Sequence, residues 1–274
     1  MAETRLARTL DAAERRLARA GAALARPAGM RAAVVALIVA ALLLRLPLVF
    51  TANDVPAGHN DANIYFNQAH AEFLKGNFYP DAHRGTGWQL LLYVVLDAYG
   101  FAAGPWVGKY ETLTGETAQA ALVAYALSAM LTVGIVAATY LLARRVLPPL
   151  PTLGAVALVA VDPYLMFIST SAMSEPPYTA LLVLALACVL KARDHPAWLV
   201  GTGVLMALAH VLRINGLVMF GATLLFAAIL LARPGRGWRR RAPWGWFAAS
   251  VAAFLLVSAP YLAWRADQLP GPFD

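Results

Sequence analysis

Long apolar runs with few charged residues constrain the fold of this chain more than any other feature. Residues 32–50, 118–142 and 244–264 form three such runs. A helix of about 17 to 25 apolar residues crosses the roughly 30 Å hydrocarbon core of a bilayer. The composition agrees, because 60% of the residues are hydrophobic and only 14% are charged, whereas soluble domains carry about 25% charged residues. The sequence therefore predicts an all-α, polytopic bundle of transmembrane helices.

Basic residues between the apolar runs predict how the chain is threaded. Further runs cover residues 152–169, 176–192 and 197–231, and the last is long enough for two crossings. The basic clusters between runs are Arg144 and Arg145, Lys191 and Arg193, and Arg233, Arg236, Arg239, Arg240 and Arg241. The positive-inside rule places all of them with the N-terminus in the cytoplasm. This requires that the apolar stretch 88–103 makes no net crossing and that the 197–231 run turns back near 213–216.

This threading divides the chain into three parts. Residues 1–31 are basic, with leucines at helical spacing, and predict a cytoplasmic amphipathic segment on an anionic leaflet. A cleaved presequence is the alternative, although the acidic residues of this segment are atypical of a transit peptide. Residues 32–265 form the transmembrane domain, whose 51–116 portion is an exoplasmic loop with interfacial helices. Residues 266–274 form an exoplasmic tail. We expect a multi-pass protein of the inner cell membrane.

Several classes of partner and cofactor gain no support from the sequence. The net charge of +7 follows the membrane topology, so it does not imply a nucleic-acid partner. The single cysteine, Cys188, cannot form an intramolecular disulfide. His59, Asp61, His70 and His83 could assemble a metal site, but their spacing matches no specific ligand pattern. A divalent metal is therefore unsupported, and no cofactor is assigned.

Asp61 is the carboxylate of the first exoplasmic loop that has the clearest local context. It follows His59 and precedes a helical pattern that places Tyr65 and Ala69 on one face. One interpretation is a helix N-cap, because Asp is among the preferred capping residues. The other is a general base that takes a proton from an acceptor hydroxyl.

Two further charged residues interrupt the apolar part of the sequence on the same predicted side. Glu175 follows Ser174 at the start of a run and either caps a helix or acts in a site. Arg213 lies within the 197–231 run, where it either snorkels to the interface or binds an anion. A lipid-linked phosphate suits the donor fork of arginine, and Arg84 and His83 are further candidates for the same phosphate.

The layout and short motifs of residues 30–265 resemble the GT-C class of polytopic glycosyltransferases, which contains the dolichyl-phosphate-mannose protein mannosyltransferases and the aminoarabinose transferases. The similar motifs are Asp61-Ala62-Asn63-Ile64-Tyr65 followed by Ala69, Gly76 and Tyr79; Arg84-Gly85-Thr86-Gly87-Trp88; Ser174-Glu175-Pro176; and Leu212-Arg213-Ile214-Asn215-Gly216 closing a helix that contains Gly201. The sequence departs from the family pattern at Thr86, where the family has proline, and at Ala62, where it has a second acidic residue.

The resemblance implies a donor, a reaction and a set of site residues. A polyprenyl-phosphate sugar is attacked with inversion, and the sugar passes to a glycan, lipid or protein on the exoplasmic face. Asp61 is the implied base, while Arg213, together with Arg84, stabilises the departing lipid phosphate. Glu175 orients donor or acceptor. His83, His59 and Tyr65 complete the predicted substrate-binding set.

Two other functions remain open at this stage. A transporter or flippase of a lipid-linked substrate also places ionisable residues between helices. A non-catalytic membrane subunit of a glycan assembly complex is the second alternative, because members of the resembled class usually continue beyond the point where this sequence stops. We therefore expect either a membrane protein partner or a missing C-terminal part.

Overall fold

The computed structural model describes residues 22, 26–51, 60–71, 86–108, 113–232 and 243–268. Within these ranges every regular element is a helix and none is a strand, so the predicted all-α class is confirmed. The helices are α2 (Pro27–Thr51), α3 (Asn60–His70), α4 (Gly87–Ala98), α5 (Gly115–Ala143), α6 (Pro149–Ala160), α7 (Pro163–Ile168), α8 (Glu175–Lys191), α9 (Trp198–Leu212), α10 (Gly216–Ala232) and α11 (Pro243–Gln268).

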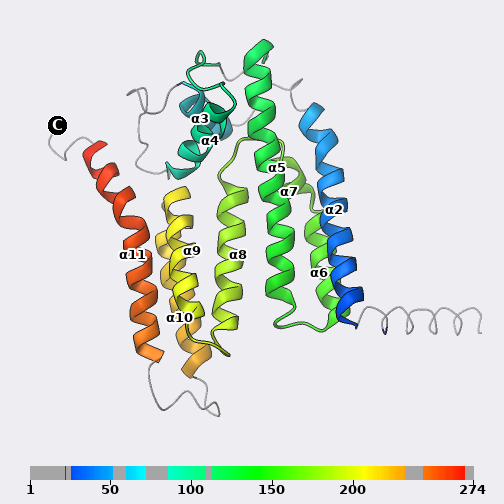
Figure 1. Cartoon of the computed structure of the whole chain (residues 1–274), viewed down its shortest axis with the longest axis vertical. Helices are drawn as coiled ribbons and strands as arrows, with labels where there is room; N and C mark the ends of the chain where they lie inside the picture. The colour runs from blue at the N-terminus through cyan, green and yellow to red at the C-terminus, as the bar shows by residue number, and fades with distance from the viewer. Residues whose placement is uncertain are drawn as a thin grey trace, which may run out of the picture.

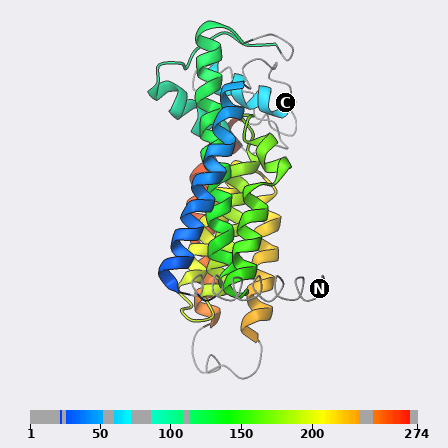
Figure 2. The same ribbon diagram turned by 90° about the vertical axis from the view of Figure 1, so that its right-hand side faces the viewer.

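The long helices lie side by side, and the two short helices α3 and α4 sit at one end of the bundle (Figures 1 and 2). We call this the site end, and it also carries the turns at 169–174 and 213–215. The opposite end, which we call the basic end, carries Arg144, Arg145, Lys191 and Arg193. These two basic clusters thus lie at the end opposite to α3 and α4, as the threading predicted.

Three of the helices are long and apolar enough to cross a bilayer: Pro27–Thr51, Gly115–Ala143 and Trp244–Asp267. The segments Gly87–Ala98, Pro149–Ala160, Trp198–Leu212 and Gly216–Leu230 are shorter apolar helices. The 197–231 run forms two helices, α9 and α10, that turn back between Leu212 and Gly216, which confirms the predicted break. The cluster of five arginines lies outside the described residues, and the cytoplasmic assignment of the basic end stays a prediction.

The single span predicted at 152–169 is wrong, because two helices, α6 and α7, occupy this run. Pro163 begins α7, and the carboxylate of Asp162 accepts a hydrogen bond of 2.8 Å from the Leu165 amide. Proline lacks the amide hydrogen that would continue α6, and aspartate is a preferred N-cap. The local chemistry of these two residues therefore outweighs the apolar character of the run.

Arg45 of α2 lies fully buried beside this break, with 0% of its surface exposed. Its Nη1 donates hydrogen bonds of 2.9 Å to the carbonyl oxygens of Ala41 and Ala160. Ala160 is the last residue of α6, whose terminal carbonyls have no partner within the helix. Arg45 therefore links α2 to the C-terminal end of α6 through a side-chain hydrogen bond.

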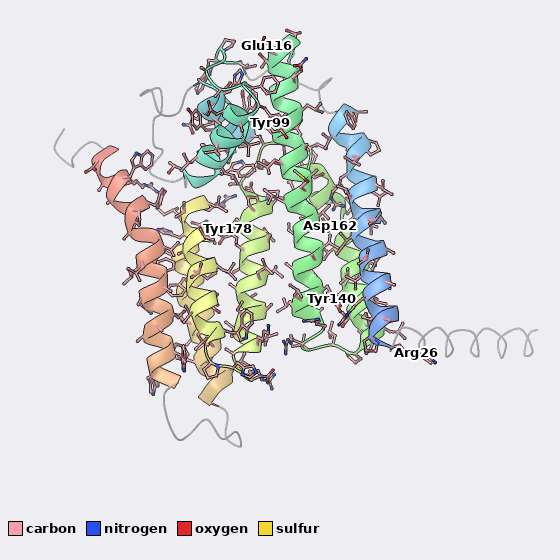
Figure 3. All side chains as sticks on the ribbon, viewed as in Figure 1. Arg26, Tyr99, Glu116, Tyr140, Asp162 and Tyr178 are labelled. Carbon is pink, nitrogen blue, oxygen red and sulfur yellow. The ribbon has the colours of Figure 1, made fainter. Side chains whose placement is uncertain are left out.

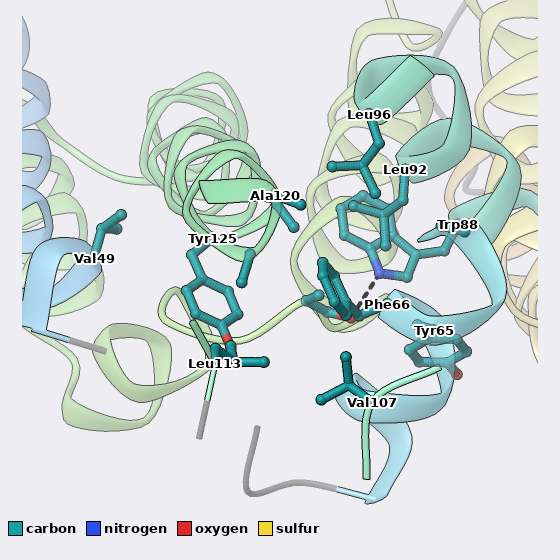
Figure 4. Close-up of a cluster of buried hydrophobic side chains, with 14 of the residues drawn as sticks. Val49, Tyr65, Phe66, Trp88, Leu92, Leu96, Val107, Leu113, Ala120 and Tyr125 are labelled. Carbon is teal, nitrogen blue, oxygen red and sulfur yellow. Dashed lines mark hydrogen bonds between the residues drawn. The ribbon is translucent and has the colours of Figure 1, made fainter. Parts of the chain in front are cut away.

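The cluster of buried side chains at the site end joins α3 and α4 to α5 (Figure 4). Trp88 and Leu92 of α4 are fully buried and pack with Tyr65 and Phe66 of α3. The Trp88 indole donates a hydrogen bond of 2.9 Å to the carbonyl oxygen of Ala172, in the turn before α8. Burial of several aromatic side chains stabilises this layer by about 1.5–3 kcal/mol per residue, so α3 and α4 are firmly placed over the helix ends.

Helices α9 and α11 approach closely at Gly203. A Cβ atom on Gly203 would lie 2.1 Å from the carbonyl oxygen of Ser250 on α11. Nearby, Phe220 of α10 stacks on Phe254 of α11 with ring centroids 4.3 Å apart. Small residues at helix crossings permit such backbone contact in membrane proteins.

We predict that Gly203→Ala lowers the free energy of unfolding by about 1–3 kcal/mol, because the added methyl group forces α9 and α11 apart. Denaturant titration of the purified chain in mild detergent measures this change. Gly221→Ala on α10 is the matched control, since a Cβ there has no neighbour within 4 Å. The control should leave stability unchanged or raise it slightly, because alanine favours helix over glycine. Equal stability of the two variants contradicts the close approach.

Candidate functional site

Polar side chains fix helix α3 at the site end. The Asn67 side chain donates to the Val107 carbonyl oxygen at 2.7 Å and accepts from the Val107 amide at 2.9 Å. Asn63 accepts a further bond from Asn67 at 2.6 Å, and the His70 carbonyl oxygen accepts from the Gly104 amide at 2.8 Å. The polar face of α3 is therefore buried against residues 104–107, and the first turn of the helix is held in place.

Helix α4 begins against the ends of α9 and α11. A Cβ on Gly87 would lie 2.8 Å from the carbonyl oxygen of Val211, so only glycine allows this contact. The Thr86 amide donates to the hydroxyl of Tyr261 at 3.4 Å, and that hydroxyl also accepts from Arg265 at 3.0 Å. Residues far apart in the sequence thus meet at one end of the bundle.

The turn between α9 and α10 sets the direction of Arg213. Arg213 leaves the helix in an extended conformation, with φ −147° and ψ 131°. The ring nitrogen Nδ1 of His210 lies 3.2 Å from the carbonyl oxygen of Ile214 across the same turn. A Cβ on Gly216 would lie 2.4 Å from the His210 backbone, so glycine is needed there. The turn is tight and leaves Arg213 at the boundary of the bundle.

Arg213 forms an ion pair with Glu175 at the start of α8. The two side chains are 28% and 22% exposed, so the pair is partly shielded from solvent. The Arg213 guanidinium also lies 3.5 Å from the Ser174 hydroxyl, which in turn lies 3.3 Å from the Tyr65 hydroxyl. The aromatic ring of Tyr178 is 6.0 Å from the guanidinium carbon, and Figure 3 places Tyr178 near the site end.

The structure bears on the capping alternatives that the sequence left open. Ser174 is the N-cap residue of α8 but makes no side-chain capping bond, because its hydroxyl is engaged by Tyr65 and Arg213. Helix α3 begins at Asn60, so Asp61 lies inside its first turn and not at the cap position. Neither side chain occupies the capping role among the contacts of the described residues.

The charge of Asp61, like the charges of Glu175 and Arg213, shifts the pKa of Tyr65. Burial raises the pKa of the Tyr65 hydroxyl. The Ser174 hydrogen bond and the charge of Arg213 lower that pKa, whereas the charges of Glu175 and Asp61 raise it. Asp61 is half-buried. The charges of α3, α8 and the α9–α10 turn therefore influence one phenol.

Four of the seven predicted site residues come together: Asp61, Tyr65, Glu175 and Arg213. His59, His83 and Arg84 lie outside the described residues, so their predicted roles stay predictions. Within the described ranges, no group of three His, Cys, Asp or Glu side chains gathers as metal ligands would.

Sequence reasoning missed several polar residues of the site end. Tyr178 lies one turn after Glu175 on α8, and the helical spacing i, i+3 could have identified it. Arg265, the last residue of the predicted transmembrane domain, is only 7% exposed. The sequence feature that could have identified Arg265 is its position as a charged residue at the end of an apolar run. Tyr261 lies one helical turn before it, and its hydroxyl joins Arg265 to Thr86.

This geometry combines a carboxylate, a guanidinium and hydroxyl groups beside the membrane boundary. A guanidinium at such a place binds phosphate through charge-assisted hydrogen bonds. A half-buried carboxylate nearby can accept a proton from a hydroxyl. The family model of the dolichyl-phosphate-mannose-protein mannosyltransferases matches residues 104–264, more than half of the chain. The chain belongs to this family. The resemblance to GT-C membrane glycosyltransferases is thereby confirmed.

A solved structure shows the same fold. The S. cerevisiae protein O-mannosyltransferase Pmt1-Pmt2 complex bound to the sugar donor contains a chain that superposes with a TM-score of 0.71 at 18% sequence identity. The match covers 91% of this chain and 35% of that chain, so this family member spans about a third of the length of its structural relative. No curated protein sequence matches the chain significantly.

We predict that Arg213 and Glu175 are coupled in stability. In a double-mutant cycle with Arg213→Gln and Glu175→Gln, the double variant should be more stable than the sum of the single effects predicts, by about 1–3 kcal/mol. The reason is that each single change leaves its partner's charge half-buried without a counter-charge. Unfolding titrations of the four proteins measure the coupling. Additive effects would contradict the ion pair.

Proposed function

We propose that this chain transfers a sugar from a polyprenyl-phosphate donor to an acceptor hydroxyl at the site end, on the exoplasmic face of the membrane. The observation that carries the proposal is the Glu175–Arg213 ion pair at one end of the bundle, within reach of the charge of Asp61, which acts on both Tyr65 and Arg213. Membership of a family named for transfer from a lipid-phosphate sugar supports it. The acceptor is a glycan, a lipid or a protein.

In the proposed reaction Asp61 is the general base. Its carboxylate takes the proton of the acceptor hydroxyl while the acceptor oxygen bonds to the anomeric carbon of the sugar. The bond between that carbon and the phosphate oxygen breaks, and the electron pair leaves with the lipid phosphate. Attack and departure occur on opposite faces of the sugar, so the configuration inverts. General base catalysis of this kind contributes about 10²–10⁴-fold to rate.

Arg213 is proposed to bind the lipid phosphate and to stabilise the charge that develops on it as the bond breaks. Its position at the α9–α10 turn supports this role, because a donor whose lipid lies in the bilayer presents its phosphate near the ends of the spans. Glu175 holds the guanidinium in place and keeps its charge balanced before the donor arrives. The Tyr65 hydroxyl, linked to Arg213 through Ser174, contributes a further polar group.

The bilayer itself contributes to the proposed catalysis. It confines the donor lipid to two dimensions and presents its head group at a fixed depth. Helices α3 and α4 are locked over the ends of α8 and α9 by Trp88 and Gly87, so the base is held at that depth. Such positioning replaces an encounter in solution and lowers the entropic part of the barrier.

The test is sugar transfer from a polyprenyl-phosphate-sugar extract to membrane acceptors by the purified chain in liposomes. Asp61→Asn should lower the rate constant at saturating donor by about 10²-fold or more, because the amide cannot accept the proton. Asp97→Asn, the same chemical change at an exposed position of α4, should stay within about twofold of the wild type. Expression and unfolding of both variants are measured in parallel.

Two results would reject parts of this proposal. Equal rates for Asp61→Asn and the wild type would remove Asp61 as the base while leaving transfer itself standing. Transfer absent from the wild-type chain, with donor binding also absent, would reject the proposed activity and favour a non-catalytic membrane subunit.

A further inference from the structure

A cavity of about 210 Å³ lies at the basic end, far from the site described above. Its lining comes from the start of α2, the end of α5 and the start of α6. The residues that bear on the argument are Pro27, Met30, Tyr140, Arg144, Leu147 and Thr152. Figure 3 places Tyr140 near Arg26 at this end of the bundle. The cavity therefore opens where three helices meet the membrane boundary.

Positive charge around this cavity has no matching carboxylate among the described residues. Arg144 is exposed, and its guanidinium carbon lies 5.3 Å from the centroid of the Tyr140 ring. Arg26 and Arg31 are also exposed and flank the lining residues Pro27 and Met30 in the sequence. By contrast, the adjacent Arg145 pairs with Asp194 at 3.2 Å. The cavity is thus bordered by cations whose charge an anion would balance.

Exposed apolar side chains lie close to the cavity lining in the sequence. Val146, in the α5–α6 connection, and Leu150, in the first turn of α6, are 57% and 55% exposed. Leu147 lines the cavity itself and is 40% exposed. A soluble anion gains nothing from such side chains, whereas the acyl chains of a phospholipid cover them. The Arg144 guanidinium and the Tyr140 hydroxyl supply hydrogen-bond donors for a phosphate.

We infer that this cavity is a binding site for the head group of an anionic phospholipid. Arg144 contacts the phosphate, Tyr140 adds its hydroxyl, and the acyl chains lie beside Val146 and Leu150. Basic pockets between transmembrane helices bind anionic lipids in this manner. The charges of Arg26 and Arg31, which have no carboxylate partner among the described residues, disfavour a zwitterionic head group with its own cation. The bound lipid would join α2, α5 and α6 at the basic end. The inference does not rest on the proposed sugar transfer.

The test uses the full chain, purified in detergent and depleted of lipid, and follows lipid binding by native mass spectrometry. Phosphatidylglycerol, phosphatidylcholine with the same acyl chains and inorganic phosphate are the three probes. Arg144→Gln should weaken the first phosphatidylglycerol binding step about fivefold, the contribution of one arginine near an anionic lipid surface. Phosphatidylcholine should bind the wild type more weakly than phosphatidylglycerol does.

Arg145→Gln is the matched control. It removes the same charge from the adjacent position at the end of α5, but its side chain does not line the cavity. We expect less than a twofold change in phosphatidylglycerol binding. Three results would overturn the inference: equal weakening by both variants, equal binding of the two phospholipids, or displacement of phosphatidylglycerol by millimolar inorganic phosphate. The last result would indicate a site for a soluble anion.

Discussion

Hydrocarbon offers no partner to a peptide amide or carbonyl, and this constraint shapes every part of the molecule. The spans must be helices, so the chain can place irregular backbone only at helix ends or where protein encloses it. The turns at 169–174 and 213–215 both lie at the site end, where Glu175 and Arg213 meet. The polar chemistry of the chain is therefore concentrated where the helices stop.

The same constraint explains why Arg45 is buried beside the break between α6 and α7. The break between α6 and α7 leaves the end of α6 without helical partners, and the buried guanidinium of Arg45 donates to the Ala160 carbonyl oxygen. Broken helices and buried charges are also features of transporters, where they occur in matched halves. Within the described residues, no second helix carries a buried arginine against a break of this kind. The family match and the polar cluster at the site end support the proposed sugar transfer more than the transport alternative.

The sequence predicted the helical class, the turn at Arg213 and the separation of the clusters Arg144–Arg145 and Lys191–Arg193 from the candidate site. These features depend on hydrophobicity and charge summed over long segments, which local detail rarely overturns. It did not predict the break at Asp162–Pro163, where two residues override an otherwise apolar run. It also did not predict the contact between Ser174 and Tyr65, because that contact joins positions that no sequence pattern relates. The pairing of Glu175 with Arg213 depends in the same way on the assembled bundle.

We propose that the site between α3, the start of α8 and the α9–α10 turn binds a polyprenyl phosphate. The first measurement to make is photolabelling of the chain in liposomes with a diazirine-bearing polyprenyl phosphate, followed by peptide mapping. We expect labelling of peptides that contain Asp61, Glu175 or Arg213, and suppression of that labelling by an excess of polyprenyl-phosphate sugar. Labelling spread over the outer faces of α2 and α11, unchanged by the competitor, would contradict it.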